Sequence, residues 1–191
     1  MSVWPDGLYA GKSLRNPVTG QTLTFLELSP ELLVMETTYQ AGGSEAPEHL
    51  HPAQSEHFVA LDGAVRVVVN GQESRLEPGK DLTLPPGTPH RFGALPDLSC
   101  RARWEVRPAL RTAEFLATTF GLAQDGHVTQ KGIPPLLRSV QIAREFDREF
   151  RLTNPPRPVQ RVVLALLGGI ARMRKVPGSY VPGSSGTDTN H

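Results

Sequence analysis

Two segments punctuated by glycine and proline constrain the fold of this chain more than any other feature. The first reads Gly43-x5-His49-x-His51-x4-Glu56-x6-Gly63, and the second, fifteen residues later, reads Gly79-x5-Pro85-x-Gly87-x2-His90. Glycine permits positive φ and proline fixes φ, so both residue types mark tight turns between short elements. The two segments therefore predict short strands whose turns bring histidine and glutamate side chains toward one another.

The polar residues of these segments form a candidate metal site. In an extended chain His49 and His51 lie on the same face, because strand side chains alternate. Together with Glu56 and His90 they offer a mixed nitrogen and oxygen ligand set. Such a set suits one divalent transition metal, Fe, Mn, Ni, Cu or Zn, and would leave positions open on a six-coordinate ion. The alternative is a degenerate site that binds no metal.

Strand parity also proposes the lining of a pocket beside the metal. If Glu56 and His90 point inward, so do Phe58 and Phe92, and Trp104 is a further inward candidate. We predict that these three aromatic residues bind substrate in a mostly apolar pocket, although each of them alone could be an ordinary core residue. His57 would point to the opposite face, so it is left out of the site.

Further short extended segments support a mainly β fold. Asn70-Gly71 is a strong two-residue hairpin signal between two strand-like runs. A run near residue 104 alternates apolar and charged residues, as a half-buried strand does. Segments rich in β-branched and apolar residues that predict strands are 21–25, 33–39, 65–69, 72–76, 81–84 and 98–106. This rhythm is typical of a sandwich or barrel.

At motif level, residues 43–93 resemble the two signature motifs of the cupin superfamily. The resemblance implies a single cupin-type jelly-roll β-barrel over residues 1–108, with the metal inside it, held by His49, His51, Glu56 and His90. One position departs from the family pattern: Ala94 stands where the second motif usually ends in asparagine. That asparagine is not a metal ligand in the family, so the departure concerns only the local turn.

After residue 108 the composition changes and the pattern becomes helical. We predict two or three α-helices in a C-terminal extension over residues 109–176. Thr112 is a candidate N-cap for a helix over 113–120, and apolar residues recur at helical steps from Leu136 to Phe150, where Asn154-Pro155-Pro156 would stop the helix. A second apolar stripe runs over 159–173. The polar and glycine-rich residues 177–191 predict a disordered tail.

Charge, too, divides the chain at this boundary. Residues 1–108 carry 9 Lys and Arg against 13 Asp and Glu, whereas residues 109–176 carry 11 against 5. The basic residues are not interleaved with aromatics, so we expect no nucleic-acid binding. The helix over 159–175 has three possible roles: packing on the barrel, pairing in a homodimer, or peripheral contact with an anionic membrane. We favour the homodimer among possible partners.

The cysteine content and the N-terminal sequence bear on the cellular compartment of the protein. Cys100 is the single cysteine, so an intramolecular disulfide is excluded, and the N-terminal residues lack the basic start and apolar run of a signal peptide. Both features favour a cytoplasmic protein.

Two functional hypotheses follow. The first is a metal-dependent enzyme acting on a small apolar or aromatic molecule, by dioxygenase-like or isomerase and lyase chemistry, with Glu56 as a catalytic proton acceptor. The second is a non-catalytic module that binds a small ligand and acts through a partner. The absence of a second clear acid–base residue in the motifs favours the module, and the open metal site favours the enzyme.

Overall fold

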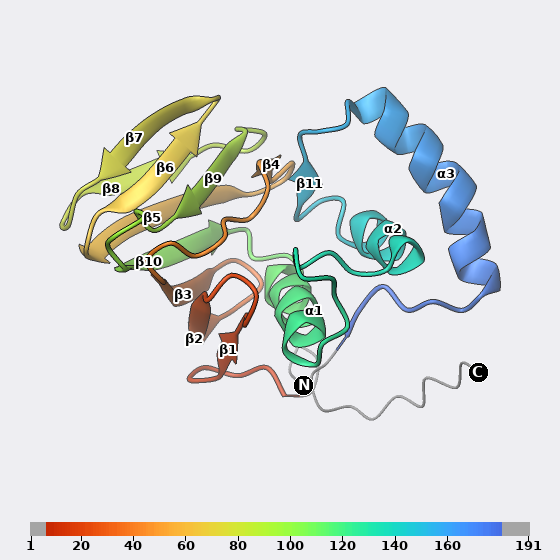
Figure 1. The fold of residues 1–191 in the computed structure, drawn as a ribbon, viewed down its shortest axis with the longest axis horizontal. Coiled ribbons are helices and arrows are strands. Elements are labelled where there is room, and N and C mark those ends of the chain that lie inside the picture. Colours follow the sequence, from red (N-terminus) through yellow and green to blue (C-terminus); the bar gives the residue numbers. More distant parts are fainter. Residues whose placement is uncertain (1–6, 181–191) are drawn as a thin grey trace.

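Two antiparallel β-sheets face each other in the computed structural model, which describes residues 7–180, and three helices lie at one end of them (Figure 1). The first sheet has the strand order β1 (Ser13–Arg15), β2 (Thr22–Leu28), β3 (Leu33–Tyr39), β10 (Cys100–Arg107), β5 (Ser55–Asp62) and β8 (Asp81–Leu84). The second has the order β11 (Arg151–Leu152), β4 (His49–Leu50), β9 (His90–Gly93), β6 (Val65–Val69) and β7 (Gln72–Leu76). The mainly β class predicted from the sequence is confirmed.

The local sequence explains the strands. Asn70 and Gly71 both have positive φ, 51° and 76°, as a tight hairpin turn requires, and they join β6 to β7. Along β10 the side chains alternate between buried Ala102 or Trp104 and exposed Arg101 or Arg103. The buried side chains of both sheets meet in one apolar core between them.

The three helices are α1 (Thr112–Gln124), α2 (Leu136–Glu145) and α3 (Arg157–Met173), and the first two differ from the prediction. Arg111, not Thr112, stands at the N-cap of α1. Thr112 lies inside the helix, where its buried hydroxyl bonds to the Gln54 side chain. Helix α1 also continues to Gln124, four residues beyond the predicted end.

The second difference is at the end of α2, which stops at Glu145 although the apolar period continues to Phe150. The chain turns after the fully buried Phe146 and forms β11, which pairs with β4. Two backbone bonds extend this pairing: Ala53 N–H donates to the Arg148 oxygen at 3.3 Å, and Thr153 N–H donates to the Glu48 oxygen at 3.2 Å. Part of the predicted extension therefore completes the second sheet.

Beyond α3 the chain returns to α1. The Tyr180 N–H donates to Thr118 Oγ1 at 3.0 Å, so residues 177–180 of the predicted disordered tail are docked on that helix. Residues 181–191 of that tail lie outside the described residues. Within the described part of the chain, no helix is long and apolar enough to cross a membrane.

Candidate metal centre

Three histidines converge between the two sheets. His49 on β4 lies directly opposite His90 on β9 in the strand register, and His51 follows β4 by one residue. All three side chains are buried, and one ring nitrogen of each lies within 4.8 Å of the corresponding nitrogens of the other two. These residues could therefore hold a metal ion, as their spacing in the sequence indicated.

The hydrogen bonds of the three rings leave the same nitrogen of each ring free. Nδ1 of His49 lies 2.8 Å from the Pro47 oxygen, and Nδ1 of His90 lies 2.9 Å from the Thr88 oxygen. Nδ1 of His51 bonds to the backbone oxygen of Glu149. A carbonyl oxygen only accepts, so each Nδ1 carries a proton, and Nε2 presents a lone pair wherever the ring is neutral. Such backbone partners are typical of metal-binding histidines, whose orientation they fix.

Glu56 faces these lone pairs from β5 in the other sheet. Its Oε1 lies 3.2 Å from Nε2 of His51, and its Oε2 lies 2.8 Å from Nε2 of His90. Where the ring is neutral, such a contact joins two acceptors. Among residues 7–180, Nε2 of His51 and Oε2 of Glu56 are buried atoms without a hydrogen-bond partner. A cation between the carboxylate and the rings would satisfy both atoms, so the residues fit a metal ion.

The electrostatics of the cluster agree with this arrangement. Burial, together with the neighbouring imidazoles His51 and His90, lowers the pKa of His49 to about 3, so that ring is neutral at physiological pH. Burial on its own would raise the pKa of Glu56, but His51 and His90 outweigh it and lower the pKa to about 2. Burial on its own would lower the pKa of His90, but the Glu56 carboxylate outweighs it, so the pKa is raised. The carboxylate therefore favours positive charge at this point.

The three predicted substrate-binding residues pack together beneath the histidines. The Phe58 ring stacks on Phe92 with centroids 3.9 Å apart and lies 5.4 Å from Trp104. Trp104 Nε1–H also donates to Glu56 Oε1 at 2.8 Å, which fixes the carboxylate. All three rings are buried. Their contact with a substrate remains a prediction, and Trp104 has a second role as the hydrogen-bond partner of Glu56.

Sequence reasoning missed the residues that cover the histidines from the C-terminal side. The Phe150 ring stacks on His49 with centroids 4.5 Å apart and on Phe115 at 4.8 Å. Glu149, which gives its backbone oxygen to His51, is held in turn because its buried side chain accepts the Arg111 N–H at 3.2 Å. We call residues 146–153 the roof segment. No sequence signal pointed to it, since its apolar spacing matched a longer helix.

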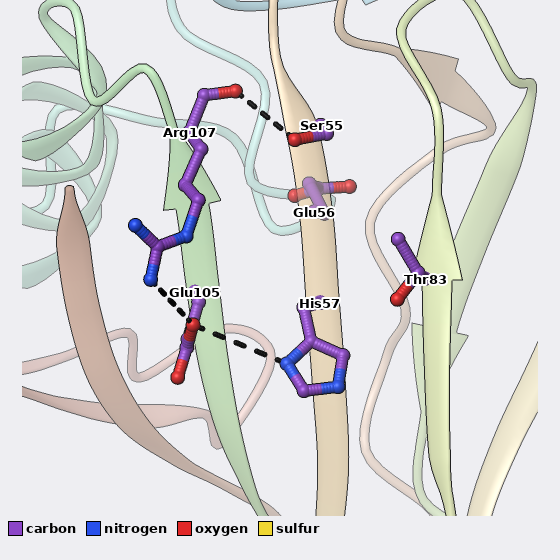
Figure 2. A pocket seen from close by; sticks show the side chains of 6 residues that line it. All are labelled: Ser55, Glu56, His57, Thr83, Glu105 and Arg107. Carbon is purple, nitrogen blue, oxygen red and sulfur yellow. Dashed lines mark hydrogen bonds and ion pairs between the residues drawn. The ribbon is translucent and has the colours of Figure 1, made fainter. Parts of the chain in front are cut away.

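His57 lies on the opposite side of β5 from the cluster, as strand parity predicted. It contacts Asp81 at 3.1 Å and, at 4.0 Å, Glu105. Figure 2 shows His57 beside Thr83, Glu105 and Arg107 at a shallow pocket of about 270 Å³, open on the outer face of the first sheet. Arg107 binds Glu105 there at 3.2 Å, so the local charges are largely paired.

Comparison with known proteins matches this region to one family. Residues 35–104, which contain all four predicted ligands, match the family described as a cupin domain. Residues 35–104 are therefore identified as a cupin domain. The tetracenomycin polyketide synthase protein TcmJ of Streptomyces glaucescens is 28% identical over 94 residues, which are 49% of this chain and 56% of TcmJ. The cupin chain thus spans little more than half the length of this curated relative.

Solved structures match about half of this chain. The polyketide cyclase RemF from Streptomyces resistomycificus is 21% identical, with a TM-score of 0.46 over 55% of this cupin and 80% of RemF. KdgF from Halomonas sp. is 23% identical, with a TM-score of 0.42 over 46% of this cupin and 79% of KdgF.

Proposed function

We propose that this cupin is a metal-dependent enzyme that acts on a small apolar or aromatic molecule. The observation that carries the proposal is the cluster of three buried histidines, whose ring nitrogens lie within 4.8 Å of one another, with the Glu56 carboxylate in contact with two of them, His51 and His90. Without a metal ion, the charge of the buried Glu56 carboxylate would have to be balanced by a proton on a neighbouring ring such as His90, whose pKa it raises. Buried polar atoms of this kind are retained where they bind something.

The donor set limits the kind of metal and the chemistry it would supply. His49, His51 and His90 would hold the ion through Nε2, with Glu56 as the fourth ligand. Nitrogen and carboxylate donors suit Fe, Mn, Ni, Cu or Zn in the divalent state. Such an ion supplies Lewis acidity toward a substrate oxygen, and a redox-active one also supports reaction with O₂.

The chain itself contributes orientation and a dry environment. Trp104 holds one oxygen of Glu56, so the other oxygen stays directed at the ligand cluster. A carboxylate whose pKa is about 2 binds a cation well and takes up a proton poorly. The ligand role of Glu56 is therefore better supported than its role as catalytic proton acceptor, which would require that it leave the hydrogen bond with Trp104.

The surroundings favour an apolar substrate. Phe58 and Phe92 lie beside the cluster on one side, and Phe150 covers it on another. Aromatic faces bind flat apolar molecules and exclude water. TcmJ carries the name of a polyketide synthase protein, which supports an aromatic or polyketone compound as the substrate class. Dioxygenase-like cleavage and isomerase or lyase chemistry both suit this combination.

One observation favours the alternative, a non-catalytic module that binds a small ligand. Phe58, Phe92 and Trp104 fill the barrel interior at stacking distance, so a substrate must approach the metal beside them or displace them. A module could hold its ligand at the edge of the barrel and signal through the helices.

Elemental analysis followed by a turnover assay distinguishes the enzyme from the binding module. Protein purified without a histidine tag or chelator should hold close to one equivalent of a transition metal, and the loaded protein should turn over aromatic diols or diketones, with O₂ uptake if the metal is iron, manganese or copper. Bound metal without turnover, but with ligand-induced stabilisation, would favour the binding module. A protein that stays metal-free after anaerobic reconstitution would refute both the site and the enzyme.

A further inference from the structure

Helix α3 stands at the periphery of the molecule and packs mainly on α2, away from the barrel (Figure 1). Only Gly168 and Ala171 of α3 are buried. Gly168 permits the close approach, because a Cβ there would lie 1.7 Å from Nη1 of Arg144 on α2. The barrel therefore does not cover the apolar stripe of this helix.

The outer face of α3 is a continuous apolar stripe. Its members follow one another at steps of three and four residues, the spacing that aligns side chains on one side of a helix. Leu166 at the centre is 67% exposed and Met173 at the end is 77% exposed. The exposed stripe consists of Val159, Val162, Val163, Leu166, Ile170 and Met173. An exposed apolar face of this length indicates an interaction surface.

The charges around the stripe are all positive. Arg161, Arg172, Arg174 and Lys175 are exposed, and no ion pair involves them within residues 7–180. From Arg151 to Lys175 the sequence has six basic and no acidic residues. At about 100° per residue, Arg174 falls beside the stripe, whereas Arg161 and Arg172 fall about 130–150° from its centre, toward the side of the helix that packs on α2. The long side chain of Arg174 can reach past the apolar face to negative groups.

A second copy of α3 offers these charges no partner. The helix has no acidic residue, so pairing of two copies along the stripe would neutralise none of its basic side chains. An anionic lipid surface complements both properties at once, since it accepts an apolar face at the acyl boundary and basic side chains at the headgroups.

We propose that α3 binds the surface of an anionic bilayer, lying flat with the Val159–Met173 stripe in the interface. The helix would not cross the bilayer, which agrees with the lack of a spanning helix among the described residues. The site is distinct from the metal centre, because the stripe faces away from the barrel. The lipid is recognised by negative headgroup charge rather than by a specific headgroup.

Flotation of the full chain with vesicles tests the proposal. The protein should bind phosphatidylcholine vesicles containing about one third phosphatidylglycerol, and binding should fall at least about fivefold on pure phosphatidylcholine and in high salt. Leu166→Glu should lower the partition coefficient about tenfold or more, and the double variant Arg172→Glu, Arg174→Glu should do the same. All variants change exposed side chains, so circular dichroism and metal content should stay as in the parent protein.

Two matched controls separate this surface from general stickiness. Leu98→Glu alters an exposed leucine outside the stripe, 45% exposed, on the barrel, and Arg75→Glu reverses an exposed arginine on β7. Both should leave vesicle binding unchanged. Light scattering measures the molar mass in solution and so detects pairing of α3 with a second copy. If the parent protein is a dimer that Leu166→Glu dissociates, and the parent does not bind vesicles, the proposal is overturned in favour of self-association. Binding that survives Leu166→Glu would overturn it as well.

Discussion

The roof segment makes the metal centre depend on a side chain that lies far from the ligands in sequence. Phe150→Ala removes the ring that stacks on His49 at 4.5 Å and on Phe115 at 4.8 Å. Replacing a fully buried phenylalanine by alanine costs about 3–5 kcal/mol. Phe150 is only partly buried, so we expect the free energy of unfolding to fall by about 2–3 kcal/mol.

Metal affinity should fall as well, because the ring holds His49 in place and the same segment holds His51. Losing an outer partner of a metal ligand typically lowers affinity about 10- to 100-fold. A tenfold loss removes about 1.4 kcal/mol of the stabilisation that bound metal adds. Chelator competition gives the dissociation constant directly, and the shift of melting temperature on metal addition gives an independent value.

A matched variant distinguishes loss of the roof from general destabilisation. Phe120 is a buried phenylalanine of α1 that is not among the rings stacked on the histidines. Phe120→Ala should lower the melting temperature without changing the dissociation constant of the metal in the folded protein. If Phe150→Ala binds metal within about twofold of the parent protein, the roof plays no part in orienting the ligands and the argument fails.

Three other predictions concern the proposed ligands, the Trp104 partner of Glu56 and the bound metal. His90→Ala should lower metal content sharply and reduce the melting temperature of protein as purified, whereas His57→Ala should do neither, both checked by elemental analysis and calorimetry. Trp104→Phe removes the hydrogen bond to the buried Glu56 carboxylate and should cost about 2 kcal/mol in chemical denaturation, with a smaller cost once metal is bound. Removing the metal with a chelator should lower the melting temperature of the parent protein and leave that of His90→Ala nearly unchanged.

Local patterns were sufficient to predict the barrel and the converging histidines. Strand parity separated Glu56 from His57. The pair Asn70-Gly71 indicated the hairpin, because these residue types tolerate the positive φ that its turn requires. These features depend on near neighbours, so the sequence records them directly. The placement of Phe58, Phe92 and Trp104 followed from the same parity.

The roof segment was not predictable for a physical reason. Its key contact joins His51 to Glu149, 98 residues apart, and uses a backbone oxygen, so no side-chain type records it. The spacing of Phe146 and Phe150 suits a helix, but burial of Phe146 and pairing of β11 with β4 compete with helix continuation. Tertiary contacts prevail here because helix propensity differs by only about 0.7 kcal/mol among ordinary residues.

The roof segment also connects the metal centre to α3, and the strength of that connection bears on both proposals. Asp147 binds Arg151 in β11 at 2.9 Å and Arg157 at the start of α3 at 2.8 Å. These side chains are about a quarter to a third exposed, and ion pairs of this kind contribute roughly 0–1 kcal/mol. Such a link is too weak to transmit a large strain. Lipid binding by α3 should therefore place the protein at a surface without changing how the ligands hold the metal, so that either proposal can fail while the other stands.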